Sequence, residues 1–163
     1  MRINGLIYEL PKELKALLGA FVIVLSIGFY SGLLFIGETT DMQPNGIEEQ
    51  FLGNETNEDP DVMKFKKNDK QMLTLIHNHV LSLSIIFFLL GIILSITQLN
   101  IRLKMFLLIE PFASIILSFG GIFFLWKGIL WMKYIIVFSG VLMTLTFILS
   151  TAIIFYQLFK RQS

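Results

Sequence analysis

Residues 105–126, which read MFLLIEPFASIILSFGGIFFLW, decide the fold, and they carry a single charged side chain, Glu110. A helix needs about 20 largely apolar residues to cross the hydrocarbon core of a bilayer, and this run supplies them. Inside lipid, backbone N–H and C=O groups must be paired within their own segment, so the run must be helical. The sequence therefore predicts a transmembrane helix at 105–126.

Three further apolar runs flank this one, at 14–36, 73–97 and 132–157. Hydrophobic residues make up 55% of the chain and charged residues 15%, whereas soluble domains carry roughly 25% charged residues. The run at 14–36 exceeds the h-region of a signal peptide, about 7–15 residues, so we expect it to be a retained helix. These observations predict an all-α integral membrane protein, with residues 1–163 forming a single membrane domain of four transmembrane helices.

The connections between the runs set the arrangement. Residues 98–104 and 127–131 are short links, and short links make neighbouring helices antiparallel. Residues 37–72 form the one long polar stretch, with nine acidic residues and four lysines. This loop is long enough either to fold over the helix ends as a cap or to remain a solvated tether.

Basic residues indicate the orientation, because short cytoplasmic loops of membrane proteins are enriched in Lys and Arg. One side of the predicted bundle receives Arg2, Lys12, Lys15, Arg102, Lys104, Lys160 and Arg161. The other side receives Lys127, Lys133 and the lysines of the 37–72 loop, where acidic residues outnumber them. We therefore expect both termini in the cytoplasm and an extracytoplasmic loop at 37–72.

Small residues recur at helical spacing within the runs, and such residues let helix backbones approach in lipid. The predicted packing positions are Gly28, Gly32, Ser114, Ser118, Gly121, Gly140 and Thr144. We expect these faces to meet at the centre of the bundle. A polar path through the bundle is the functional alternative.

Glu110 is the carboxylate that lies near a span, and it precedes Pro111. Its structural interpretation is an acid near the N-terminus of its helix, neutralised by Arg102 and Lys104. The alternative is a site for a proton or another cation, since ionisable residues within membranes are candidates for function.

The chain has two histidines, His77 and His79. A helix turns about 100° per residue, so the two rings diverge by roughly 200° and cannot chelate one ion together. Each ring is able to serve a separate site, since neutral imidazole binds haem iron, copper and zinc. A structural role at headgroups or beneath the acidic loop, and a proton-linked role, are the alternatives. Gly91 shares a flank with His77 and leaves room there, which favours His77 as the inward ring.

The stretch HNHVLSLS at 77–84, together with Gly91, resembles the H-x-H helix of small four-helix bacterial membrane proteins of unassigned function. It is more distantly similar to the H-x-H helix in the catalytic subunits of haem-copper oxidases and nitric oxide reductases. There the two histidines face opposite ways and each ligates a different haem. The resemblance implies a protein of the bacterial inner membrane, with haem as the possible cofactor. The chain departs from the larger family because it has no further histidine, so a second haem ligand must come from a methionine, another subunit or a partner.

Several classes of function are excluded or disfavoured. The absence of cysteine excludes disulfides and thiolate chemistry, and no basic cluster indicates nucleic acid. No acid pair, nucleophile or phosphate-binding loop indicates an enzyme, so we assign no catalytic residue. We expect a non-catalytic accessory or structural subunit of a membrane complex, in contact with lipid and with further copies or other membrane subunits. The alternative is a haem- or metal-binding protein of a respiratory or redox chain that uses His77, His79 or both.

Overall fold

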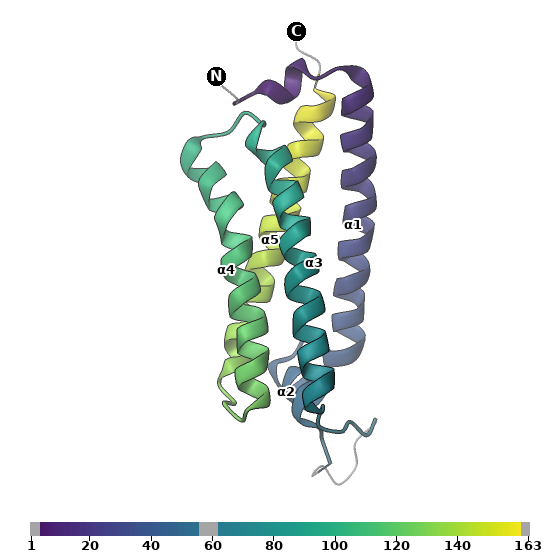
Figure 1. Ribbon diagram of the computed structural model, residues 1–163, viewed down its shortest axis with the longest axis vertical. Helices are drawn as coiled ribbons and strands as arrows, with labels where there is room; N and C mark the ends of the chain where they lie inside the picture. The colour runs from purple at the N-terminus through teal and green to yellow at the C-terminus, as the bar shows by residue number, and fades with distance from the viewer. Residues whose placement is uncertain (1–3, 56–61, 161–163) are drawn as a thin grey trace.

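The computed structural model describes residues 4–55 and 62–160, and within them the chain is helical. The elements in chain order are the 3-10 helix η1 (Leu6–Glu9), α1 (Lys12–Thr40), α2 (Pro44–Leu52), α3 (Asp69–Ser95), α4 (Ile101–Trp126) and α5 (Met132–Phe159). Four of them, α1, α3, α4 and α5, are long and apolar enough to cross a membrane. They form an elongated bundle with η1 at one end and α2 at the other (Figure 1). The predicted all-α fold with four transmembrane helices is confirmed.

Helices α3 and α4 begin ahead of their apolar runs because polar side chains cap them. The Asn68 side chain accepts a hydrogen bond from the backbone N–H of Gln71 at 2.9 Å, and the Gln71 side-chain oxygen accepts one from the backbone N–H of Asn68 at 3.0 Å. This capping box begins α3 ahead of the apolar run. Asn100 caps α4 in a similar way, accepting from the Arg102 N–H at 2.9 Å. Hydropathy alone does not predict that the helices include these polar first turns.

Helix α4 is the most buried of the four candidate spans and packs against both α3 and α5. In the apolar stretch of 18 residues that would cross the membrane, 50% of α4 is buried, against 11% of α1. Its contact with α5 is close, because a Cβ added at Gly121 would lie 2.9 Å from Cγ1 of Ile136. The Ser118 and Ser139 hydroxyls share a hydrogen bond of 2.7 Å across the same contact.

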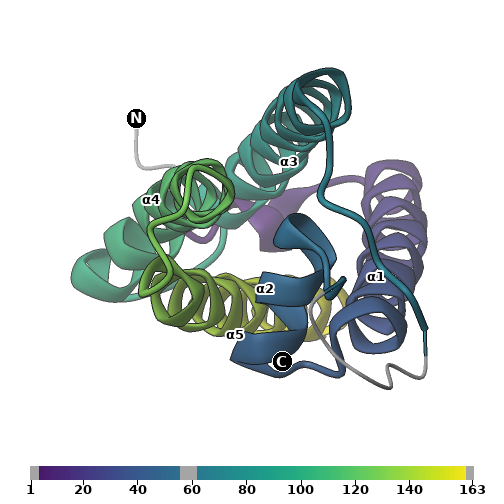
Figure 2. The same ribbon diagram turned by 90° about the horizontal axis from the view of Figure 1, so that it is seen from below.

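Helix α1 lies at the edge of the bundle, where it packs on α5 and α2 (Figure 2). Val22 is buried and Phe29 is partly buried against the core. The Phe29 ring stacks on Phe147 of α5 with centroids 3.9 Å apart and meets the edge of Phe87 of α3 at 6.4 Å. Most of the remaining apolar surface of α1 is exposed and available to lipid or a partner.

The described part of the 37–72 stretch forms a cap. Helix α2 lies across the end of the bundle next to α1 and α5 (Figure 2). A Cβ at Gly46 would overlap the Thr40 carbonyl, so this close turn between α1 and α2 requires glycine. Glu48 of α2 forms an ion pair of 2.7 Å with Lys133 at the start of α5.

The chain that follows α2 is also tied down. The Asn54 side chain donates to the Val62 carbonyl at 2.9 Å and accepts from the Lys64 N–H at 2.7 Å. Farther on, the Trp126 indole N–H at the end of α4 donates to the Lys67 carbonyl at 2.8 Å. Of the two alternatives for this loop, cap or tether, its described residues therefore form the cap.

The opposite end of the bundle is closed by η1 and by the end of α5. Ile7 is fully buried, and its N–H donates to the Ile96 carbonyl just after α3 at 3.1 Å. Gln157 of α5 accepts from the Gln98 N–H at 2.6 Å and donates to the Gln98 carbonyl at 2.9 Å. These bonds join three helices at one level.

Candidate functional site

The two histidines lie near the beginning of α3, and both are exposed. The His79 ring lies 5.4 Å from the Phe119 ring of α4, centroid to centroid. His79 follows buried Met72 by two helical turns and precedes buried Phe87 by about two more, so it lies on the stripe that faces the bundle. The expectation that His77 is the inward ring is therefore wrong. Gly91 does face α4, but His77 and Leu81, which precede it on the expected flank, are exposed.

The tautomer of His79 follows from its hydrogen bond. Nδ1 lies 2.9 Å from the Leu75 carbonyl, and a carbonyl only accepts, so Nδ1 must donate. In a neutral ring Nε2 then keeps its lone pair, which is the arrangement that many histidine ligands of metals have. Among the described residues, no group of three or more His, Asp or Glu side chains gathers as a metal site would require.

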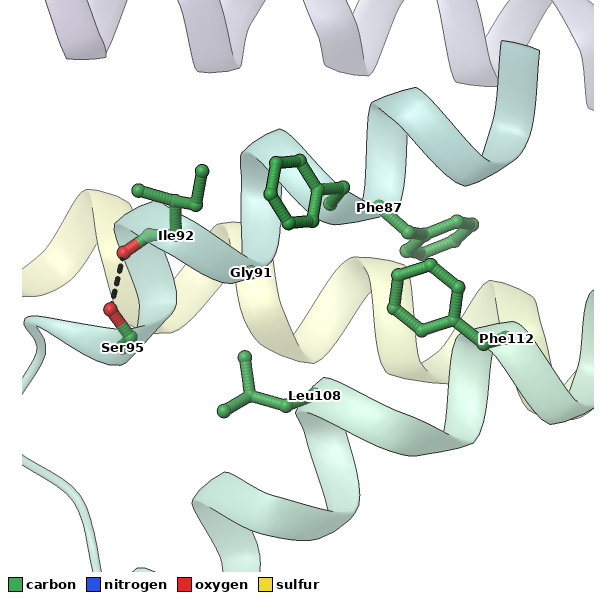
Figure 3. A pocket seen from close by; sticks show the side chains of 7 residues that line it. Phe87, Gly91, Ile92, Ser95, Leu108 and Phe112 are labelled. Carbon is green, nitrogen blue, oxygen red and sulfur yellow. Dashed lines mark hydrogen bonds between the residues drawn. The ribbon is translucent and has the colours of Figure 1, made fainter. Parts of the chain in front are cut away.

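The space beside Gly91 is filled in part by α4. A Cβ at Gly91 would lie 3.2 Å from Cδ2 of Leu108, so the glycine permits close packing of the two helices. A shallow apolar groove remains there, opened between α3 and α4 (Figure 3). The residues that line this groove include Phe87, Gly91, Ile92, Ser95, Leu108 and Phe112. Neither histidine lines this groove, so nothing links it to a haem at His77 or His79.

Small residues of α4 and α5 contact each other, but those on α5 are not the ones expected from the sequence. Ser114, Ser118 and Gly121 of α4 are buried, and Gly121 and Ser118 contact α5. On α5 the buried polar residues are Ser139, Thr146, Ser150 and, at the end of the helix, Gln157. Gly140 has open space where a Cβ would stand, and the Thr144 hydroxyl donates back to the Gly140 carbonyl at 2.8 Å. The expected α5 face at Gly140 and Thr144 is thus displaced by one residue to Ser139, because Ile136 and Ser139 fill the contact with α4.

The small-residue face of α1 does not reach the centre of the bundle. Gly28 and Gly32 are exposed, and a Cβ at either would meet nothing within 4 Å. Their expected place in the central packing is therefore corrected. The physical reason is that Phe29 and Val22 fill the inward side of α1, which leaves the glycines on an outer flank.

Glu110 lies inside α4 and only 7% of it is exposed. Its Oε1 accepts a hydrogen bond from the Ser114 hydroxyl. Its Oε2 is buried and has no hydrogen-bond partner within residues 4–55 and 62–160. The next residue, Pro111, has no N–H, so the Leu107 carbonyl one turn earlier lacks its usual helical donor.

The expected neutralisation of Glu110 by Lys104 is not found. The Lys104 ammonium donates instead to Oδ1 of Asn4 at 2.7 Å, to the Ser95 carbonyl at 2.9 Å and to the Thr97 carbonyl at 2.6 Å. Three acceptors satisfy its three donors. Arg102 is exposed at the helix end. Lys133 forms its ion pair with Glu48 at the other end of the bundle.

Four apolar helices in one capped bundle define a multi-pass helical membrane protein. Residues 41–163 match the Aq_1264_TM family, described as a transmembrane helical domain, and the chain belongs to that family because the match covers well over half of it. The match begins just after α1 and includes α2 to α5. Neither a curated protein nor a solved structure matches the chain. This result agrees with the resemblance to small membrane proteins and gives no similarity to haem-copper oxidases.

Proposed function

We propose that the protein is a non-catalytic subunit of a membrane complex, and that α1 contacts its partner. The observation that carries this proposal is the open flank of α1 at Gly28 and Gly32, where two glycines one turn apart face outward with nothing within 4 Å of a Cβ.

Exposed glycines in a transmembrane helix lower the stability of the helix, and packing against a second helix offsets this loss. Each lowers helix stability by about 1 kcal/mol relative to alanine. Lipid chains gain little from a glycine surface, whereas a second helix gains close backbone contact there. A transmembrane helix is therefore the partner that best fits this flank.

The position of α1 supports the same conclusion. It is the least buried of the four candidate spans, at 11% of its apolar stretch. It also precedes the part of the chain that matches the family. The bundle of α3, α4 and α5 thus carries most of the internal packing, and α1 keeps its outer flank for association.

Crosslinking tests the proposal directly, because the chain has no cysteine of its own. A Gly32→Cys variant carries a thiol-linked photo-crosslinker in native membranes. Leu34→Cys is the matched control, since Leu34 is 52% exposed on the same helix but points about 200° away from Gly32. We expect protein adducts from Gly32→Cys and none from Leu34→Cys.

The mass of the adduct identifies the partner class. An adduct of twice the mass of the chain indicates a second copy, and any other discrete mass indicates a different subunit. Lipid adducts alone at both positions, or equal protein adducts at both, would overturn the proposal.

A further inference from the structure

Glu110 has no other ionisable side chain near it in the transmembrane part of the sequence. The sequence has no Asp, Glu, Lys, Arg or His at 16–37, 80–101, 111–126 or 134–159. These ranges cover the middle of all four candidate spans. No basic side chain on α1, α3 or α5 is therefore available at the depth of Glu110.

The charged groups nearest along the packed elements are engaged elsewhere. Lys104 bonds to carbonyl and amide oxygens at the end of α3. Glu48 of α2, which also packs against α4, pairs with Lys133 at the opposite end of the bundle. An ionised carboxylate at Glu110 would lie in low dielectric without a counterion, which is strongly unfavourable.

The surroundings restrict which cation neutralises the carboxylate. Metal cations that prefer oxygen need several ligands arranged around them. Only the Ser114 hydroxyl bonds to the Glu110 carboxyl among the described residues, and Oε2 is buried. Glu110 lines neither the groove between α3 and α4 nor a second apolar groove between α1 and α5. A proton requires neither a coordination shell nor a cavity.

We propose that Glu110 is a proton-binding site in the membrane interior, holding its proton on Oε2. Binding transfers a proton from hydronium to Oε2, which forms the O–H bond, releases water and leaves the side chain neutral. The Ser114 hydroxyl orients the carboxyl by donating to Oε1.

The site has a consequence for helix packing. Glu110 and Ser114 lie on the buried side of α4 with Ser118, whose hydroxyl meets Ser139 of α5. A neutral carboxyl is compatible with this contact, whereas an ionised one would draw water between the helices. The bound proton therefore maintains the packing around the buried face of α4. This inference is independent of the proposed contact through α1.

Infrared spectroscopy of the purified full-length protein in lipid bilayers at neutral pH tests the site. We expect a carbonyl stretching band of a protonated carboxylic acid that shifts in D₂O and is lost in Glu110→Gln. Glu38→Gln is the matched control, because Glu38 is an exposed carboxylate at the end of α1, and it should keep the band. Glu110→Gln should melt within a few degrees of the parent, since glutamine is a neutral side chain of the same size.

Chemical modification of the unaltered protein supplies a second measurement that does not depend on a variant. A hydrophobic carbodiimide, which reacts with protonated carboxyl groups in membranes, should modify the peptide that contains Glu110. Absence of both the infrared band and the adduct would overturn the proposal. A Glu110→Gln variant that fails to fold would also overturn it, because that result would show that the negative charge is required.

Discussion

His77 and His79 are separated by one residue, yet their surroundings differ in a way that matters for chemistry. His79 faces Phe119 of α4 and donates through Nδ1 to Leu75. His77 is exposed on the other side of α3. Of the two rings, that of His79 is therefore the better oriented for binding a ligand, because its Nδ1 hydrogen bond fixes the ring and leaves the lone pair on Nε2.

The haem alternative makes a prediction at this residue. On that alternative, protein purified from haem-replete cells shows a Soret band, and His79→Ala removes or shifts it, because axial ligation sets the spectrum. His77→Ala is the matched control and should leave the band unchanged. A colourless, metal-free preparation would reject the alternative and leave the proposed non-catalytic subunit.

At the scale of elements, the contact between α4 and α5 depends on one of two adjacent glycines. Gly121 faces Ile136, whereas a Cβ at Gly120 would meet nothing within 4 Å. Hydropathy does not separate the two residues, since both lie in the same apolar run. Only the rotation of α4 relative to α5 distinguishes them.

Substitution of the two glycines tests this contact. We expect Gly121→Leu to lower the free energy of unfolding of the bundle, by about 1–3 kcal/mol as for overpacked cores. Gly120→Leu should be neutral or slightly stabilising, because leucine has the higher helix propensity at both positions. Thermal unfolding in detergent provides the comparison, and equal melting temperatures for the two variants would contradict the close crossing at Gly121.

At the scale of the whole molecule, both short loops and the capping segment place polar groups at the two ends of the bundle. The cap joins α1, α2 and the start of α5 through Gly46 and the ion pair of Glu48 with Lys133. The other end gathers η1, Gln98 and Gln157. Because the spans are even in number, η1 and the end of α5 lie on the same side of the membrane.

The orientation of this bundle remains a prediction from the basic residues. We propose that the η1 end is cytoplasmic and the α2 end extracytoplasmic. A reporter fused after Ser163 should then be active in the cytoplasm, and a tag inserted after Glu55 should be accessible from outside. Glu55 is exposed and is preferred to Asn54, whose side chain holds the cap together. Protection of the tag in intact spheroplasts would show the opposite orientation.

Much of the architecture follows from the local pattern of residues. Each of the four apolar runs, which contain Gly32, Phe87, Ser118 and Phe147, is too long and too apolar to be exposed to water. In lipid only helices with internally paired backbones are permitted. Short connections between α3, α4 and α5 leave antiparallel packing as the available arrangement. The four long helices and their approximate bounds were therefore predictable from composition, length and spacing alone, whereas the short helix α2 within the polar loop was not.

Rotation of the helices about their axes was decided only by the tertiary structure. Gly28 and Gly32 face outward, Ser139 replaces Gly140 at the α4 contact, and His79 replaces His77 as the ring facing a neighbour. The physical reason is that a transmembrane helix is apolar all round, so its sequence lacks the polar stripe that marks the outer side of a soluble helix. The local sequence also did not show that Lys104 bonds elsewhere than to Glu110. Its acceptors are oxygens of Asn4, Ser95 and Thr97. These partners meet only after α3, α4 and η1 have packed together.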